Sequence, residues 1–397
     1  MSRVSVAIYL DNNATTRTDP SVVQAMLPFF AERFGNASSA HAFGRQVAGA
    51  MRQARHSVQA LVGAAHDDEI VFTSGGTESN NAAILSALAT QEGRDEIVTT
   101  SVEHQAILAL VEQVAQSGAK VHLIAVDSRG RLDLEAFRSA LGPRTAIASV
   151  MWANNETGTV FPVERLAGWA RASGALFHTD AVQAVGRVPI DLKASVIDML
   201  SLSGHKLHGP KGIGALYLRK GTTFRPLIRG GGQERRRRGG TENIPGIVGL
   251  GKAAELAAER LDRAHVRVAA LRDRLEQSIL QNGHCTALGD HCNRLPNTTN
   301  IAFEGLEGEA IVHHLNRADI AASLGSACSS GAMEPSHVLR AMHVPASSLP
   351  GAVRFSLSHE TTAEEIDQVV RALSDILVRL RGMSRELAPL AIRNSWS

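Results

Sequence analysis

The sequence has few cysteines and no long apolar run. Only three cysteines occur in 397 residues, which argues against a disulfide framework and favours a reducing compartment. No window approaches the roughly 18 uninterrupted apolar residues of a membrane-spanning helix. The apolar run at the N-terminus is also too short for a signal peptide. We therefore expect a soluble, cytoplasmic protein with no membrane partner.

The chain also has almost no net charge. Its 41 basic and 39 acidic side chains leave a formal charge of +2, so the charge balance does not favour nucleic acid as a partner. The one basic run, Arg235–Arg238, is short and isolated, and we expect it to lie in a solvated loop. Hydrophobic residues make up 44% of the chain, which at this length is enough to bury a large core.

Short apolar runs alternate with helical segments between about residues 50 and 260. The run EIVFT (69–73) precedes a turn and the helical NAAILSALAT, and EIVTT (96–100) precedes another helical segment. This alternation predicts βαβ units and a mainly parallel sheet. Such sheets bind ligands beyond the carboxyl ends of their strands. Polar clusters follow four of the predicted strands here: Ser74–Asn80, Asn154–Gly158, Asp180–Gln183 and Gly204–Lys206.

A long helical segment over 247–280, rich in Ala, Leu, Glu and Arg, follows this alternating part. We predict that it breaks near Arg263–His265. Further short apolar runs and an amphipathic helix over 362–382 come after it. The predicted organisation is a large cofactor-binding domain over 16–262 and a smaller α+β domain formed by 1–15 and 263–397.

Lys206 stands in a glycine-rich turn directly after an apolar strand. An amine at this position can form an imine with a carbonyl cofactor. Asp180 offers a carboxylate for the ring nitrogen of a pyridine-type cofactor, and Gln183 offers an amide for a ring oxygen. The acid and the amine are 26 positions apart (206 − 180), about one strand and its crossover. They can therefore lie at neighbouring strand ends, whereas Lys211 belongs to the next turn and is expected to be solvated.

The segment TSGGTESN has the composition of a phosphate-binding turn. Gly75 and Gly76 let backbone N–H groups approach a phosphate, the following helix presents its positive N-terminus, and Thr77 adds a hydroxyl. His104, in SVEHQA, is a candidate to stack on a cofactor ring and to transfer protons near neutral pH. Each feature alone also fits a helix cap or a structural histidine, and their combination favours a cofactor site.

Cys328 lies among Gly, Ser and Ala in SLGSACSSGAMEPSH (323–337), without the apolar neighbours of a core cysteine. We expect a mobile cysteine loop over about 323–335, whose thiol can reach a bound substrate. Arg354 is a candidate for bidentate binding of a substrate carboxylate. The alternative is that it forms an ion pair on the surface. Asn155 could bridge the cofactor and that carboxylate.

Taken together, these motifs resemble the cysteine desulfurases of the nitrogen-fixation (NifS) type, which are class-V aminotransferase-like enzymes. The resemblance covers nearly the whole chain and implies the fold-type I α/β architecture of pyridoxal-phosphate transferases. That fold has a mainly parallel seven-stranded sheet covered by helices, a smaller α+β domain and a homodimeric assembly. The matching segments are YLDNNATT, FGNASSAH, FTSGGTES, VMWANNETGT, FHTDAVQAVG, SGHKLHGPKG, RGGGQERRRRGGTEN, GSACSSG and RFSLS. Ala37 and Leu324 depart from the usual residues of the family.

The resemblance implies a role for each matching residue. Lys206 would hold pyridoxal 5′-phosphate as an imine, and Cys328, Lys206 and His104 would be the catalytic residues. Asn155 and Arg354 would bind the substrate carboxylate. The implied cofactor contacts are Lys206, Gly75, Gly76, Thr77, His104, Asn155, Asp180, Gln183, Ser203, His205 and, from the partner subunit, Thr241.

The implied reaction removes sulfur from L-cysteine, releases L-alanine and leaves a persulfide on Cys328. The sulfur would then pass to an iron–sulfur scaffold protein of the NifU type, for nitrogenase maturation. By resemblance only, Cys328 could also share an iron–sulfur cluster transiently. The segment MWANNETGT favours the nitrogen-fixation branch of the family over a housekeeping desulfurase.

Other functions stay open from the sequence. A selenocysteine lyase would use nearly the same residues, whereas an aminotransferase has no use for Cys328. GIVGLGKA (246–253) fits the start of a nucleotide-binding P-loop but lacks its Ser or Thr. A metal-binding protein is a more distant alternative, with four candidate ligands in GHCTALGDHC: His284, Cys285, His291 and Cys292.

Overall fold

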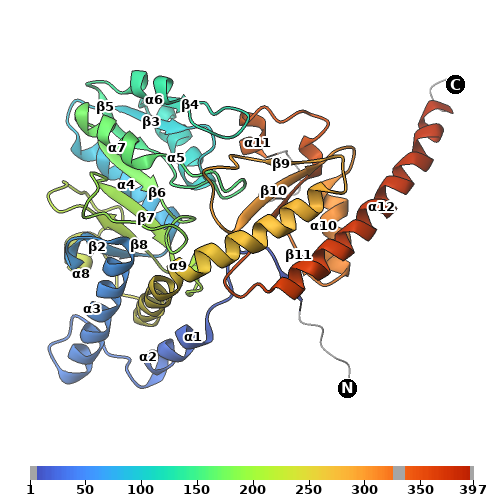
Figure 1. Cartoon of the computed structure of the whole chain (residues 1–397). Helices are drawn as coiled ribbons and strands as arrows, with labels where there is room; N and C mark the ends of the chain where they lie inside the picture. Colours follow the sequence, from blue (N-terminus) through green and yellow to red (C-terminus); the bar gives the residue numbers. More distant parts are fainter. Residues whose placement is uncertain (1–6, 325–335, 394–397) are drawn as a thin grey trace.

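The computed structural model describes residues 7–324 and 336–393, with side chains up to residue 382. Cys328 and most of the predicted cysteine loop lie outside the described residues. Figure 1 shows a large sheet between helices at one end and a smaller sheet at the other. The long helix α9 (Ile244–Leu280) runs from one part to the other.

Seven strands form the large sheet in the order β2-β8-β7-β6-β5-β3-β4. All neighbouring strands are parallel except β8, which is antiparallel to both β2 and β7. The predicted seven-stranded, mainly parallel sheet is therefore confirmed. Its strands are β2 Ile70–Thr73, β3 Glu96–Thr100, β4 Lys120–Ile124, β5 Thr145–Ser149, β6 Leu176–Asp180, β7 Met199–Ser203 and β8 Gly214–Leu218.

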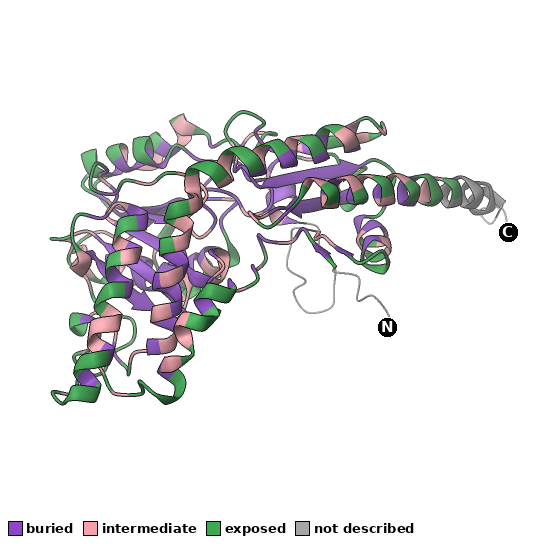
Figure 2. Cartoon of the chain, turned by 60° about the horizontal axis from the view of Figure 1, so that its bottom comes forward, coloured by how far each residue is buried: buried purple, intermediate pink, exposed green. Residues whose placement is uncertain are grey.

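Apolar residues cover both faces of this sheet, as its continuous apolar strands require. On one face Phe72 and Leu200 pack with residues of helices such as α3 (Ala42–Val62), α7 (Val163–Ala172) and α9. On the other face the neighbouring Val71 and Met199 pack with α4 (Gly76–Thr90) and α5 (Gln105–Gln116). Figure 2 shows the strands buried between helices whose outer faces are exposed. The remaining helical elements of this part are α1 Pro20–Met26, α2 Pro28–Ala31, η1 Asp67–Glu69, α6 Leu134–Ala140, η2 Gly204–Lys206 and α8 Gln233–Arg236.

The smaller part has its own sheet and core. A three-stranded antiparallel sheet has the order β12-β10-β9, and the N-terminal β1 pairs in parallel with β11. The final helix is longer than the predicted 362–382. The elements are β1 Ile8–Tyr9, β9 Cys285–Leu288, β10 Thr298–Phe303, α10 Gly308–Arg317, β11 Ile320–Ala321, α11 His337–Ala341, η3 Leu349–Gly351, β12 Ala352–Ser356 and α12 Ala363–Arg393.

Helix α9 belongs to both cores. Its residues Ile247 and Leu250 pack in the large core, whereas Leu275 and Ile279 pack in the small one. The break predicted near Arg263–His265 is wrong, because the helix is continuous there and the segment contains no proline or glycine to interrupt it. The predicted boundary between 262 and 263 falls inside this helix. The division into two domains stays a prediction, which the two separate cores support.

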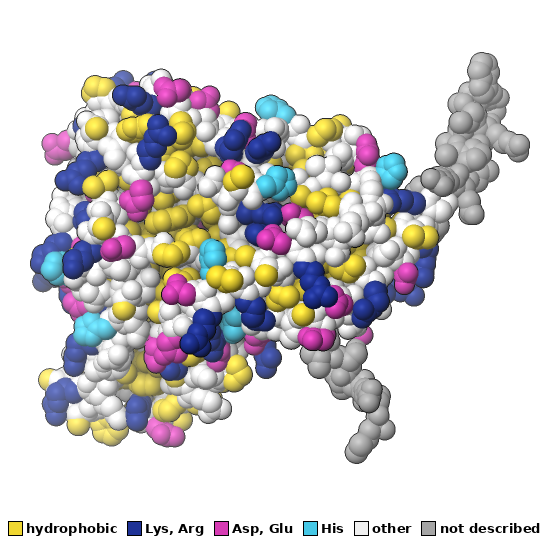
Figure 3. All heavy atoms as spheres, viewed as in Figure 1, with side chains coloured by type: hydrophobic (Ala, Val, Ile, Leu, Met, Phe, Trp, Pro, Cys, Tyr) yellow, Lys and Arg dark blue, Asp and Glu magenta, His cyan; other side chains and the backbone are white. Residues whose placement is uncertain are grey.

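The P-loop interpretation of GIVGLGKA is wrong, because this segment lies inside α9. Its glycines instead allow close packing: a Cβ on Gly251 would lie 2.5 Å from Cα of Ala54 in α3. No helix in the described part of the chain has the length and apolar character needed to cross a bilayer. On the face seen in Figure 3, basic and acidic side chains are interspersed.

Candidate active site

Lys206 ends the short helical turn η2 (Gly204–Lys206) that directly follows β7. Its Nζ donates hydrogen bonds to the carbonyl oxygens of Asn13 and, at 2.7 Å, Ala14. Burial lowers the pKa of this amine to about 7, and the charges of Arg187 and Arg354 act in the same direction. A large fraction of the amine is therefore unprotonated at neutral pH, as a nucleophile or base requires. The rival Lys211 is exposed, as expected.

Asp180 ends β6, the neighbour of β7, and is buried. Asn80 Nδ2 donates to its Oδ2 at 2.6 Å, and the backbone N–H of Val182 donates to its Oδ1 at 3.0 Å. These two hydrogen bonds hold the carboxylate in one orientation. Its negative charge acts to raise the pKa of both Lys206 and His104. The structure therefore brings these three residues into one site.

Gln183 is held at both ends of its amide. Its Nε2 donates to the carbonyl oxygen of Asn13 at 3.0 Å, and Arg187 Nη1 donates to its Oε1. Because Oε1 accepts from a guanidinium, the NH₂ group is directed toward the N-terminal segment that also binds Lys206. Sequence analysis did not identify Arg187, although it stands four residues after Gln183 and directly after the motif FHTDAVQAVG.

His104 is the N-cap of α5, and its Nδ1 accepts from the backbone N–H of Ala106 at 3.1 Å. Burial lowers its pKa, against the opposing effect of Asp180. The ring is therefore neutral at pH 7, with its proton assigned to Nε2 because Nδ1 is an acceptor. A neutral ring with an Nε2–H donor suits stacking on a cofactor better than an imidazolium would.

The predicted phosphate-binding turn lies at the N-terminus of α4. Gly75 is its N-cap with φ 155° and ψ −175°, a backbone conformation that is essentially restricted to glycine. A Cβ on Gly76 would lie 2.7 Å from Cγ2 of Val182, so a side chain would close this approach. Thr77 in the first turn is exposed. The first-turn N–H groups of a helix have no intrahelical acceptors and can bind a phosphate.

Ser203 ends β7 and lies beside this turn, whereas His205 belongs to η2, which follows β7. The Ser203 Oγ lies 3.8 Å from the position that a Cβ on Gly75 would take. His205 makes a hydrogen bond of 3.1 Å between its Nδ1 and Thr15 Oγ1. Burial, reinforced by Lys206, lowers the pKa of His205 to about 4, so it is neutral at physiological pH. Ser203 is therefore placed near the turn, and the structure places His205 beside Thr15 of the N-terminal segment.

Arg354 in β12 is buried, so the surface ion-pair alternative is wrong. Its Nη2 donates to Asp11 Oδ1 at 2.6 Å, and its Nη1 donates to the carbonyl oxygen of Asn155 at 3.0 Å. Its charge lowers the pKa of Lys206, which puts it within electrostatic range of that amine. A substrate carboxylate at this guanidinium would therefore share it with Asp11.

Thr241 is exposed and is not in contact with Lys206 within this chain. It lines a small cavity together with Ser74, the residue before the phosphate-binding turn. The expectation of a solvated basic run is only partly correct, because Arg238 pairs with Glu78 of α4 at 3.0 Å. Arg55 and Glu234 form a buried ion pair of 2.6 Å just before this run. The role of Thr241 depends on a second subunit and stays a prediction.

Two buried acids were missed because nothing in their local sequence separates them from surface carboxylates. Burial raises the pKa of Glu103 to about 8, although its carboxylate accepts from the Met151 N–H at 3.0 Å. Burial also raises the pKa of Glu156, which accepts from Ser336 Oγ at 2.5 Å. These acids directly precede His104 and follow Asn155, so they support the backbone of two predicted site residues.

The metal-binding alternative receives no support. No group of three or more potential ligands that could hold an ion occurs among the described residues, which include 283–292. Cys285 and Cys292 are free cysteines. Cys285 is partly buried, and its Sγ donates a hydrogen bond to the carbonyl oxygen of Ile279 at 3.4 Å. Cys292 is exposed. The predicted site residues themselves fit pyridoxal phosphate. They combine a partly deprotonated buried lysine, an oriented carboxylate on the neighbouring strand and a helix N-terminus at which glycine leaves space.

Comparisons with known proteins show the family of this chain. The Aminotransferase class-V family matches residues 8–369. A cysteine desulfurase of Bradyrhizobium diazoefficiens is 74% identical over 97% of this chain and 98% of its own length. The cysteine desulfurase NifS of Azotobacter vinelandii is 60% identical over 95% and 94%. A solved NifS-like protein matches 94% of this chain and 100% of its own at 38% identity and a TM-score of 0.89. The chain therefore belongs to the class-V aminotransferase family, as its motifs predicted.

Proposed function

We infer that this chain is a pyridoxal-phosphate-dependent cysteine desulfurase. Curated desulfurases are 60% and 74% identical to it over at least 95% of its length. The observation in the structure that carries the inference is the buried amine of Lys206, with a pKa of about 7, within electrostatic range of Asp180. A buried and partly neutral lysine beside a fixed carboxylate suits a carbonyl cofactor. Burying a lysine lowers the stability of the fold, so such a residue indicates a functional site.

We assign the cofactor-holding groups as follows. Lys206 would hold the cofactor through its aldehyde, Asp180 would hold the ring nitrogen, and Gln183 and His104 would contact the ring. When bound, pyridoxal phosphate withdraws electrons from the substrate carbon that loses a proton. The phosphate contacts are Gly75, Gly76, Thr77, Ser203, His205 and the partner's Thr241.

The protein groups then have distinct tasks in the reaction. Arg354 and Asn155 hold the L-cysteine carboxylate, and the Lys206 amine accepts and returns the proton at the substrate Cα. The thiolate of Cys328 attacks the substrate sulfur, so one S–S bond forms while the Cβ–S bond breaks. The substrate Cβ gains a proton and the bonding electrons, giving L-alanine, and the Cys328 sulfur is oxidised to a persulfide.

Replacing Cys328 with alanine tests this assignment. The variant should retain the visible absorbance of the bound cofactor, since Lys206 is intact, but alanine production from L-cysteine should fall to background. Sulfide and alanine are measured in parallel with a reductant present. Turnover equal to that of the wild type would refute Cys328 as the nucleophile.

We also propose a biological setting for the enzyme. The 60% identical relative is named NifS, which favours nitrogenase maturation and a NifU-type scaffold protein as the sulfur acceptor over a housekeeping role. Cluster assembly on a purified NifU-type scaffold, compared with a housekeeping scaffold, distinguishes the two. Selenocysteine as a competing substrate tests the lyase alternative, which the same residues would allow.

A homodimer is part of this proposal. Four large apolar side chains between α1 and the start of α3 are exposed: Leu27, Phe30, Phe34 and Phe43. The rings of Phe34 and Phe43 pack with centroids 5.6 Å apart. Apolar side chains gathered in this way on the surface suit contact with a second copy of the chain.

A further inference from the structure

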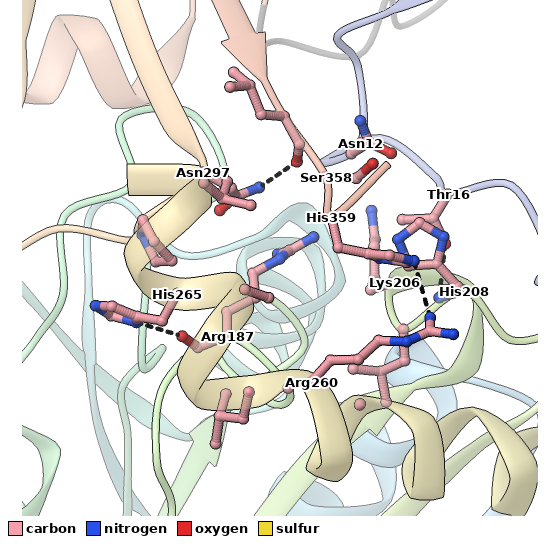
Figure 4. A pocket seen from close by; sticks show the side chains of 18 of the residues that line it. Asn12, Thr16, Arg187, Lys206, His208, Arg260, His265, Asn297, Ser358 and His359 are labelled. Carbon is pink, nitrogen blue, oxygen red and sulfur yellow. Dashed lines mark hydrogen bonds between the residues drawn. The ribbon is translucent and has the colours of Figure 1, made fainter. Parts of the chain in front are cut away.

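A cavity lies next to Lys206, between α9 and the N-terminal segment (Figure 4). Of the predicted site residues only Lys206 lines it, so it is separate from the positions of Asp180, His104 and Arg354. The cavity offers about 80 Å³ of space to water-sized occupants. Since one water needs roughly 10–15 Å³ of such space, the cavity can hold a molecule of about five to eight non-hydrogen atoms.

The two sides of this cavity differ in chemistry. Helix α9 supplies an apolar strip, formed by Leu256, Ala257, Leu261, Ala264 and Val268, and also the polar side chains of Arg260 and His265. Figure 4 shows polar side chains from other segments around the same space. These include Asn12, Arg187, Lys206, Asn297 and Ser358. A ligand that fits both sides has a polar end and a short apolar chain.

The charges that face the cavity favour an anion. Asp19 is the one acidic residue in the lining, and it already pairs with Arg260 at 3.0 Å. Burial lowers the pKa of both His208 and His359 to about 4, so neither ring is charged at neutral pH. His265 donates its Nδ1–H to the carbonyl oxygen of Arg187 at 3.1 Å.

The guanidinium of Arg187 is the candidate group for binding this anion. It has no ion pair within the described part of the chain, and its side-chain hydrogen bonds both run from Nη1 to Gln183. Its Nε and Nη2 have no acceptor among the described residues. Burial lowers its pKa to about 10, which still leaves it charged at neutral pH. A partly buried guanidinium with two free donor groups suits a carboxylate.

We propose that this cavity binds a small aliphatic carboxylate, with its carboxylate on Arg187 and its chain against α9. The occupant lies where α9 passes from the large core to the small one, so it couples the positions of the two cores. It also adds a negative charge close to Lys206. A bound ligand therefore changes the electrostatic environment of Lys206 without occupying the substrate site.

Butyrate, with six non-hydrogen atoms, is a suitable probe, and butyramide is its uncharged counterpart. Binding to the cofactor-loaded enzyme is measured by titration calorimetry with L-alanine present to occupy the substrate-carboxylate site. Butyrate should bind at one site per chain, and butyramide should bind at least roughly tenfold more weakly because it forms no ion pair. Equal affinity for the two compounds would overturn the role of Arg187.

A filled cavity provides the second test. The variant Ala264→Leu places three extra carbon atoms in the cavity and should abolish butyrate binding while turnover of L-cysteine without butyrate stays unchanged. Val266→Leu is the matched control, because Val266 is exposed on the same helix and does not line the cavity. The proposal fails if butyrate binds Ala264→Leu as tightly as wild type, or if excess L-alanine displaces it.

Discussion

The amine of Lys206 is a residue whose ionisation links folding to pH. Burial takes its pKa from the ordinary 10.5 to about 7, whereas in the unfolded chain it returns to the ordinary value. Between these two values the unfolded chain binds more protons than the folded one, so the stability of the cofactor-free protein rises with pH in this range. The penalty for burying the cation is fully present below pH 7 and fades toward pH 10.5.

Replacing Lys206 with methionine should therefore stabilise the cofactor-free protein at neutral pH. Each pKa unit corresponds to about 1.4 kcal/mol, so the gain at pH 7 is on the order of a few kcal/mol. Urea unfolding of both proteins from pH 6.5 to 9.5 measures it. The gain should shrink steadily as the pH rises, and a gain independent of pH would contradict the assigned pKa.

Side-chain partners across long sequence distances were the least predictable part of the site. Lys206 and Asp180 were placed together correctly, because both follow strands and such strands end at one edge of the sheet. Asn80 was not assigned to Asp180, since 100 positions separate them and only the packing of α4 on the sheet brings them together. The same holds for Arg187: its charge is visible in the sequence, but the sequence does not show that it has no acidic partner among the described residues.

At the scale of single elements, the contact between α3 and α9 depends on a residue without a side chain. A Cβ on Gly251 would lie 2.5 Å from both Cα and Cβ of Ala54, closer than packed atoms can approach. Helix propensity favours alanine over glycine by about 1 kcal/mol. Overpacking against a backbone atom costs more, typically about 1–3 kcal/mol.

Gly251→Ala should therefore lower the free energy of unfolding by about 1–2 kcal/mol net. Gly168 in α7 is the matched control, because it is exposed and a Cβ there would meet no atom within 4 Å. Gly168→Ala should raise the stability by about 0.5–1 kcal/mol. Chemical denaturation of both variants gives the comparison, and opposite signs are expected; stabilisation by both would show that α3 moves aside freely.

The direction of β8 and the continuity of α9 were not predicted from the sequence, for identifiable reasons. The direction of β8 was not predicted, because a short apolar strand such as IGALYL reads the same in either direction. The break predicted in α9 near Arg263–His265 does not occur, because charged side chains on an outer helix face leave the helix intact. The mainly parallel sheet was predictable because alternating strands and helices imply it.

For the whole molecule, the exposed apolar surface near α1 and α3 makes the homodimer testable. The double variant Phe34→Ser, Phe43→Ser removes two rings that are 68% and 54% exposed in the single chain. Such exposed positions contribute little to the fold of one chain, so the variant should fold but dissociate at concentrations where the wild type is dimeric. Size-exclusion chromatography with light scattering measures this, and an unchanged dimer mass would place the interface elsewhere.

The shared helix α9 has a consequence for dividing the chain. Cutting the gene between codons 262 and 263 would end the first fragment in mid-helix and start the second with a free helical end. Each fragment would then lack a neighbouring turn of α9 that the other carries. The two pieces should therefore recover activity only when expressed together, which would make this helix a natural point for a split-enzyme reporter.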